Sequence, residues 1–158
     1  MAEPGARYEK TFEVRATDLD VNRHLTSSAY LDYAIHARMS SLADLGLLEV
    51  LAAERLAPVV FRDEIDYRRE LRALDRVSVS VELAGLSEDG SRWRLHHEFT
   101  RADGVHSARI RTDGAWFHLR TRKLTVPPPA FARDFAALHH TDDFEVLPNP
   151  AAPGEPSG

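Results

Sequence analysis

The apolar residues of this chain change their spacing at Pro58, and this change limits the folds that the chain can form. Before it, the apolar residues of 29–45 recur at helical spacing on two adjacent faces, namely Leu31, Ile35, Leu42 and Leu45 on one and Tyr30, Ala34 and Ala37 on the next. After it, apolar residues alternate with polar ones, as in strands buried on one face. The order predicts an α+β fold, in which an antiparallel sheet wraps a long apolar helix on most sides.

Alternating runs predict five strands. They lie at 8–17, before the helix, and near 59–67, 77–83, 92–99 and 106–119. Glu88-Asp89-Gly90 and Arg101-Ala102-Asp103-Gly104 have the composition of hairpin turns. The apolar parity of the last run shifts at Asp113-Gly114, which indicates either a β-bulge or a hairpin turn, and we favour the bulge.

Helix ends and terminal segments follow from glycine and proline. Gly46 is a plausible end for the long helix, and residues 47–57 predict a second helix ended by Pro58. After Pro127-Pro128-Pro129, residues 131–138 have the pattern of a short helix. We expect a flexible N-terminus at 1–7, a folded domain at 8–126, a C-terminal extension at 127–147 and a disordered tail at 148–158.

Composition excludes several classes of function. A chain of 158 residues with 43% apolar and 28% charged residues is typical of one globular domain, and a net charge of −5 argues against nucleic-acid binding. The absence of cysteine excludes disulfides, thiolate metal sites and a cysteine nucleophile. The histidines form no ligand-like cluster, so we expect no metal and no cofactor. Without an apolar N-terminal region or a run of ~18 apolar residues, we expect a cytoplasmic protein that does not enter membranes.

The segment Asp18-Leu19-Asp20-Val21-Asn22-Arg23-His24 concentrates reactive groups at the mouth of the long helix. It is followed by Thr26, Ser27 and Ser28, whose hydroxyls can each cap the helix; a cap at Thr26 would place Leu25 and Tyr30 at the positions of a hydrophobic staple. The first N–H groups of a helix have no partner within the helix, and the helix dipole adds positive charge there. A carboxylate, an amide and an imidazole beside such donors are suited to attack on an acyl carbonyl.

Each of these residues also has a purely structural interpretation. Asp20 and Asn22 are common turn residues, and Asp20 could form an Asx-turn. Glu70 could be an exposed charge at the end of a strand, and Asp63, on the apolar parity of its strand, points to a cavity or a bulge. Tyr30 and Tyr33 are most simply core or pocket-wall residues. The arginines Arg68, Arg69, Arg72 and Arg76 form either a solvated face or a contact with the phosphates of coenzyme A or phosphopantetheine.

The Asp18–His24 segment resembles the signature of the hotdog-fold thioesterases. Its Asp-x-Asn-x-His pattern is similar to the catalytic motif of plant and bacterial acyl-carrier-protein thioesterases, and Tyr30 and Ala37-Arg38 match the bacterial acyl-CoA and 4-hydroxybenzoyl-CoA thioesterases. A second segment, Asp66-Tyr67-Arg68-Arg69-Glu70-Leu71, is similar to the Tyr-Arg-Arg-Glu-Cys segment of the acyl-carrier-protein enzymes. The resemblance covers about residues 8–126 and implies a hotdog fold, in which a curved sheet of about five strands wraps the central helix.

The resemblance implies hydrolysis of an acyl thioester of coenzyme A or of an acyl-carrier protein. The catalytic residues that it implies are Asp20, Asn22, His24 and Glu70, and the substrate-binding residues are Thr26, Ser27, Ser28, Tyr30, Arg68 and Arg69. It implies a homodimer or homotetramer with the groove between protomers, so that Glu70 could face the partner's Asp20–His24 loop. A carboxylate would activate water or attack the carbonyl directly to form an anhydride.

Three positions depart from the families, and two other functions stay open. Thr26-Ser27 replaces an Asn-Asn pair, Leu71 replaces the cysteine, and His36 lies near the usual position of a helix glutamate. One alternative is a hotdog (R)-specific hydratase or dehydratase, whose motif is Asp-x-Asn-x-x-His, commonly with proline after the asparagine. Here His24 follows Asn22 by two positions and no proline intervenes. The other alternative is a module that binds acyl-CoA without catalysis.

Overall fold

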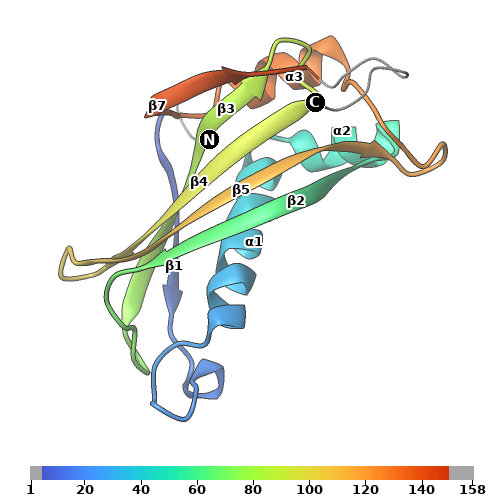
Figure 1. Ribbon diagram of the computed structural model, residues 1–158. Coiled ribbons are helices and arrows are strands. Elements are labelled where there is room, and N and C mark those ends of the chain that lie inside the picture. The colour runs from blue at the N-terminus through green and yellow to red at the C-terminus, as the bar shows by residue number, and fades with distance from the viewer. Residues whose placement is uncertain (1–4, 150–158) are drawn as a thin grey trace, which may run out of the picture.

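Five long strands form one antiparallel sheet in the computed structural model, which describes residues 5–149. The strands are β1 (Tyr8–Glu13), β2 (Leu56–Tyr67), β3 (Arg76–Ser87), β4 (Arg92–Arg101) and β5 (His106–His118). Their order across the sheet is β1-β3-β4-β5-β2, and the sheet curls around the helix α1 (Ser27–Asp44), as Figure 1 shows. The flexible ends expected at 1–7 and 148–158 fall largely outside the described residues.

Helix α1 buries one of its two apolar faces fully and the other only in part, since Leu42 of this second face is 2% exposed. Tyr30, Ala34 and Ala37 lie in the core, whereas Ile35 on the other face is 50% exposed. The prediction of a long central helix wrapped by a curved antiparallel sheet is confirmed. The sheet covers one side of α1, and the Ile35 side is left without a covering element among residues 5–149.

The two ends of the next helix are set by left-handed backbone. Gly46 (φ +71°) ends α1 as expected and leads directly into α2 (Leu47–Glu54). The predicted end of α2 at Pro58 is wrong, because Arg55 already turns the chain with φ +56°. Pro58 instead lies inside β2, opposite Trp116 of β5. Proline is tolerated there because β2 is the edge strand of the sheet.

The bulge predicted near Asp113-Gly114 is present, but its extra residue lies on the neighbouring strand. β5 runs through without a turn, and the register with β2 moves from Val60↔Gly114 to Arg62↔Asp113, so that Phe61 is the extra residue. Gly114 is required by close approach. A Cβ at this position would lie 2.4 Å from the Trp93 ring and 2.4 Å from the backbone oxygen of Val59.

The first strand and the C-terminal region differ from the sequence prediction. β1 ends at Glu13 rather than Thr17, and a short 3-10 helix, η1 (Ala16–Asp18), follows it. The predicted C-terminal helix is α3 (Pro129–Ala136), after a short strand β6 (Lys123–Leu124). The strand β7 (His140–Leu147) was not predicted; it pairs in parallel with the part of β3 beyond β1.

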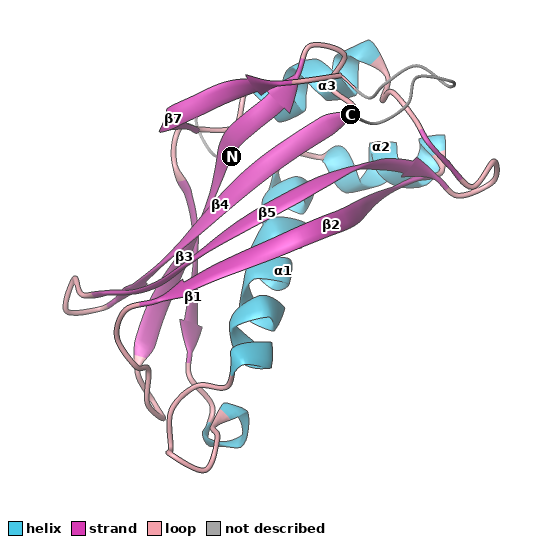
Figure 2. Cartoon of the chain, in the orientation of Figure 1, coloured by secondary structure: helices cyan, strands magenta, loops and turns pink. Residues whose placement is uncertain are grey.

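The two ends of α1 have different surroundings, as Figure 2 shows. At its C-terminal end, Phe131 and Phe135 of α3 pack edge-on against Trp116, with ring centroids 4.8 and 5.3 Å apart. At its N-terminal end lies the loop that carries the Asp18–His24 segment, next to the chain that connects β2 to β3. Within residues 5–149, no helix is long and apolar enough to cross a membrane.

Candidate active site

The carboxylate of Asp20 organises the loop before α1. Its Oδ1 accepts hydrogen bonds from the backbone N–H groups of Asn22 (2.9 Å) and His24 (3.1 Å). The backbone N–H of Asp20 donates to the carbonyl of His24 (2.8 Å), and Arg23 adopts a left-handed conformation with φ +60°. Asp20 thus makes the Asx-type contacts of its structural interpretation, and it brings the side chains of Asn22 and His24 into a compact turn.

The loop is fastened to the fold by Asp18, which the sequence analysis did not single out. Its carboxylate accepts two hydrogen bonds from Arg15 (2.9 and 3.0 Å) and one from the hydroxyl of Tyr33 on α1 (2.9 Å). The hydrogen bond from Arg15 is the main reason that the pKa of Asp18 lies below its usual value. Tyr33 stacks on Phe12 at 4.7 Å, so it is a core residue, as its structural interpretation predicts.

The first turn of α1 leaves two backbone donors free. Thr26, one of the three candidate capping residues, is the N-cap, because its hydroxyl accepts from the N–H of Ala29 (3.2 Å). The N–H of Thr26 itself donates to the carbonyl of Asp18 (2.9 Å). The N–H groups of Ser27 and Ser28 have no acceptor among the described residues, and both residues are exposed. An incoming carbonyl oxygen could therefore be bound by these two donors.

Two clefts lie near the loop that precedes α1, and residues 26–29 line neither. The first, of about 430 Å³, is lined by Leu19, Asn22, Arg23, His24, Arg72 and Ala73. The second, of about 490 Å³, is lined by Glu70, Arg72, Asp75, Arg76, Arg101, Ala102 and Asp103. Arg72 is the residue that they share. The second cleft carries equal numbers of arginines and carboxylates, so it is formally neutral and does not form a basic patch.

Glu70 belongs to the segment that contacts the His24 loop of its own chain. The next residue, Leu71, is buried and accepts the N–H of Leu25 through its carbonyl (2.8 Å), which joins this segment to the loop. The pKa of Glu70 is lowered, first by a hydrogen bond from its own backbone N–H and then by Arg72 and His24. The expectation that Glu70 faces a partner's loop is thus not needed to bring it near an imidazole.

Tyr30 forms part of the wall behind the loop. It is buried, and its ring meets those of Tyr67 and Phe99 edge-on at 5.3 and 5.2 Å. Burial raises the pKa of Tyr30 to about 12, so its phenol stays neutral and can only donate or accept hydrogen bonds near neutral pH. This geometry agrees with the interpretation of Tyr30 as a core or pocket-wall residue.

Arg68 and Arg69 point away from these two clefts. Arg68 donates to Glu98 on β4 (3.0 Å), and Arg69 donates to the carbonyl of Arg68 (2.8 Å). Neither lines the cleft that contains His24; the arginines that do so are Arg23 and Arg72. Arg23 was missed because it lies inside the motif at a variable position. Its left-handed conformation, which follows from the tight turn, is the feature that directs it here.

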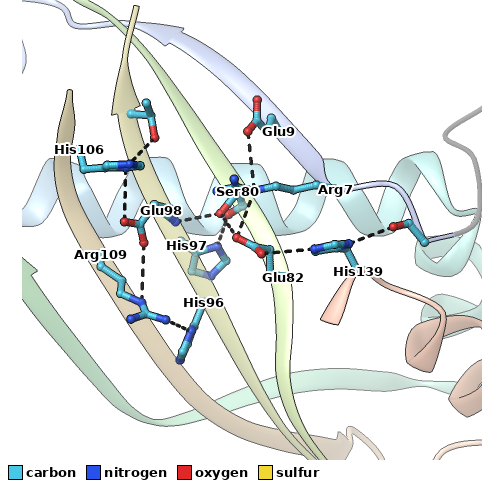
Figure 3. Close-up of polar contacts among 12 residues, drawn as sticks. Arg7, Glu9, Ser80, Glu82, His96, His97, Glu98, His106, Arg109 and His139 are labelled. Atoms are coloured by element: carbon cyan, nitrogen blue, oxygen red, sulfur yellow. Dashed lines mark hydrogen bonds and ion pairs between the residues drawn. The ribbon is translucent and has the colours of Figure 1, made fainter. Parts of the chain in front are cut away.

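A separate polar network covers the outer face of the sheet, opposite α1 (Figure 3). Glu98 lies near Arg109 (3.7 Å), and Arg109 donates to Nδ1 of His96 (2.6 Å). The guanidinium can only donate, so the proton of His96 is on Nε2, and burial together with Arg109 lowers the pKa of this imidazole. Glu82 pairs with Arg7 at 3.2 Å. Residues 5–149 hold no group of three or more histidine and acidic residues placed to bind a metal.

Two polar groups lie on the inner side of the sheet. Asp63 accepts a hydrogen bond from Thr112 (2.7 Å) and follows the bulge between Val60 and Arg62, so the bulge interpretation of this residue is confirmed. His97 is fully buried on β4, with Nδ1 2.9 Å from the carbonyl of Ser80. Burial is the main reason that the pKa of His97 falls to about 3. Both residues are remote from the loop clefts and contribute to structure.

Comparison with known proteins gives one family and many similar folds. The family model described as the thioesterase-like superfamily matches residues 14–135. A search of the curated proteins gave no match.

Three solved structures illustrate the similarity of fold. The probable thioesterase YbaW of Escherichia coli is 23% identical with a TM-score of 0.74, over 83% of this chain and 98% of its own. The 1,4-dihydroxy-2-naphthoyl-CoA thioesterase Slr0204 of Synechocystis is 19% identical with a TM-score of 0.69, over 81% and 93%. The SAV2348 protein of Staphylococcus aureus, in complex with CoA, is 17% identical with a TM-score of 0.76, over 100% and 98%. At these identities the likeness concerns the fold alone.

Proposed function

Because the chain belongs to the thioesterase-like superfamily and has the hotdog fold, we propose that it hydrolyses an acyl thioester to a free acid and a thiol. The observation that carries this proposal is the free pair of N–H groups of Ser27 and Ser28 at the start of α1, which follow in the chain directly after the loop whose Asn22 and His24 line a cleft. Preorganised donors of this kind stabilise the oxyanion that forms when a thioester carbonyl is attacked.

We assign the role of general base to Glu70 rather than Asp20. One carboxylate oxygen of Asp20 already accepts two backbone N–H groups, and this contact maintains the loop. Glu70 has an exposed carboxylate near His24, and its lowered pKa keeps it ionised at neutral pH. Direct attack by Glu70 to form an anhydride is the other route that the same position supports.

In the proposed reaction, the oxygen of a water molecule forms a bond to the thioester carbon while Glu70 accepts a proton. The carbonyl electrons move to the oxygen held by the Ser27 and Ser28 N–H groups. They return as the carbon–sulfur bond breaks, and His24 donates a proton to the departing sulfur. Asn22, which lines the same cleft, would orient the carbonyl or the water.

The substrate class is a thioester of coenzyme A or of an acyl-carrier protein. The support for coenzyme A is that the SAV2348 protein of similar fold is in complex with CoA, and that Arg23 lines the cleft next to His24. We retain Thr26 and Tyr30 as the capping residue and wall of the site. Arg68 and Arg69 would contact substrate only after leaving their present partners. A cytoplasmic location remains a prediction from composition.

We also propose that the protein is a homodimer or homotetramer. β2 is an edge strand that pairs only with β5 along the described chain, and it carries exposed apolar residues such as Phe61. Ile35 of α1 is half-exposed as well. An unpaired strand of this length is usually covered in soluble proteins.

The function is tested by thiol release from a panel of acetyl-, hexanoyl-, decanoyl-, palmitoyl- and benzoyl-CoA. Because the chain has no cysteine, a thiol reagent reads only the product. We expect Glu70→Gln and His24→Ala to lower kcat by about 100-fold, in the range that removal of a proton-transfer group gives elsewhere. Equal trace rates in the wild type and both variants would show that the site is assigned wrongly.

Two further readings of the same assay separate the alternative functions. Loss of the enoyl absorbance of crotonyl-CoA without thiol release would indicate a hydratase. Tight binding of decanoyl-CoA with no thiol released over hours would indicate a binding module without catalysis.

A further inference from the structure

The proposed base, Glu70, sits in a segment whose shape is fixed by its neighbours. After β2 the chain makes a tight turn in which the N–H of Arg72 donates to the carboxylate of Asp75 (2.9 Å). Leu74 has a left-handed backbone with φ +69°, and its N–H donates to the carbonyl of Val14 (2.8 Å). The N–H of Val14 donates in return to the carbonyl of Asp75 (2.9 Å). The backbone of Arg72 is therefore held in place from both sides.

From this fixed position the side chain of Arg72 reaches back to the proposed base. Its Nη2 lies 3.2 Å from Oε1 of Glu70. The same side chain lines the cleft that contains His24 and the cleft that contains Glu70. No other residue of the described range 5–149 lines both of these clefts. The guanidinium thus stands at the junction between the carboxylate and the imidazole.

Two other arginines near Glu70 bind other carboxylates. Arg101 makes a two-point contact with Asp103, at 3.1 and 2.6 Å. Arg68 is held by Glu98. Among residues 5–149, Arg72 is the one residue whose side chain donates a hydrogen bond to Glu70. It bonds one carboxylate oxygen, so the other oxygen has no side-chain donor among these residues.

We propose that Arg72 is a positioning residue of the thioesterase reaction, which holds the Glu70 carboxylate beside His24 with one oxygen free to accept a proton from water. This inference rests on the proposed function. One hydrogen bond to a rigid turn restricts the rotation of a side chain that is otherwise exposed. Small displacements of a catalytic group lower rates strongly, so loss of this contact affects kcat more than substrate binding.

Arg72 has a second, measurable effect on the same carboxylate. Together with His24 it contributes to the lowered pKa of Glu70. A base with a lowered pKa remains active to lower pH, so removing Arg72 moves the acid limb of the pH profile upward. A residue that only stabilised the fold would not shift this limb.

The test compares Arg72→Met, which keeps the length of the side chain without its charge, with Arg72→Lys and with Arg133→Met. Arg133 is an exposed arginine on α3 and serves as the matched control. With the CoA thioester that wild type turns over fastest, we expect Arg72→Met to lower kcat about ten-fold with KM changed less than about three-fold. Arg72→Lys should recover part of the loss, and Arg133→Met should match wild type.

Two readouts separate a role through Glu70 from a general defect. In a Glu70→Gln background, Arg72→Met should cause no further loss of kcat, because the partner through which it acts is gone. Carboxyl NMR titration should show the pKa of Glu70 higher in Arg72→Met than in wild type. An active enzyme with unchanged kcat, pH profile and Glu70 titration in Arg72→Met overturns this role alone. Absence of thiol release by wild type from every substrate overturns the proposed function and this role with it.

Discussion

At the scale of single residues, the loop before α1 shows how one side chain can serve structure and chemistry at once. Asp20 was a catalytic candidate because of its motif, and its carboxylate instead accepts two backbone N–H groups of its own turn. This contact aligns Asn22 and His24 along one cleft. The motif is thus partly a folding signal, and an intact motif is needed for the cleft to exist.

The two roles of Asp20 predict different results for two substitutions. Asp20→Asn keeps an oxygen that can accept the N–H groups of Asn22 and His24, so we expect kcat within about ten-fold of wild type. Asp20→Ala removes the acceptor, and we expect a loss of about 100-fold because the turn that places His24 is released. Thiol release under saturating substrate measures both. If Asn is as damaging as Ala, the carboxylate itself is required and Asp20 is the better candidate for the base.

His97 predicts how stability responds to acid. Its pKa is 6.5 when unfolded and about 3 in the folded protein, so the unfolded chain binds a proton over this range and the folded protein does not. Stability is therefore complete above pH 6.5 and falls as the pH drops toward 3, by up to ~1.4 kcal/mol per pH unit. His96 has a lowered pKa as well and acts in the same direction.

Replacement of His97 by asparagine should flatten this dependence. Asparagine keeps a donor for the carbonyl of Ser80 and carries no titrating group. Urea unfolding at several pH values between 6 and 4.5 measures the slope of the unfolding free energy against pH. Most carboxylates with lowered pKa values, such as Asp18, change this free energy only at lower pH. A control variant, His140→Asn, changes an exposed histidine and should keep the wild-type slope. An equal slope in His97→Asn would contradict the prediction.

At the scale of elements, local chemistry predicted more than packing did. The N-cap within 26–28, the end of α1 at Gly46 and the hairpin turns depend on a few adjacent residues, so they could be predicted from the sequence. The burial of the two apolar faces of α1 could not be predicted, because it depends on how much of the helix the sheet covers. β7 was missed because its residues are largely polar and exposed, and its pairing with β3 depends on distant contacts.

The candidate site divides in the same way. The loop, the cap and the free donors of α1 lie within eleven residues of sequence, from Asp18 to Ser28, and the motif predicted them together. The position of Glu70 beside His24 depends on the contact between Leu71 and Leu25, and that of Arg72 on a turn anchored to Val14. Such contacts join segments about fifty residues apart, and no local pattern encodes them.

Gly114 gives a prediction for the bulge between β2 and β5. A methyl group there would meet the rigid ring of Trp93 and the backbone of Val59, so we expect Gly114→Ala to lower the free energy of unfolding by ~1–3 kcal/mol or more. Gly85→Ala is the matched control, because its Cβ would meet mainly the side chain of Leu147, at 2.8 Å, which can rotate away. Urea denaturation compares the two. Similar losses of unfolding free energy in both variants would mean that the sheet shifts to accommodate a methyl group at Gly114.

At the scale of the whole molecule, the two edges of the sheet are built from different strands. β1 and β7 lie one after the other along β3, whereas β2 pairs with β5 alone and leaves its outer edge without a strand in residues 5–149. Figure 1 shows β2 running the full length of the sheet on this open side. Val60 and Phe61, 43% and 52% exposed, lie at the bulge and precede the charged residues of this strand.

This open edge predicts that two copies pair through β2. A carboxylate at Phe61 would be desolvated in such an interface, so we expect Phe61→Glu to weaken the dimer at least about ten-fold. Val126→Glu changes an equally exposed apolar residue outside the strand and should leave assembly intact. Sedimentation velocity distinguishes the 17.7 kDa chain from its oligomers. A wild type that stays monomeric at micromolar concentration would contradict this assembly. Because the loop clefts lie within one chain, thiol release by that monomer would also show that the site is complete without a partner.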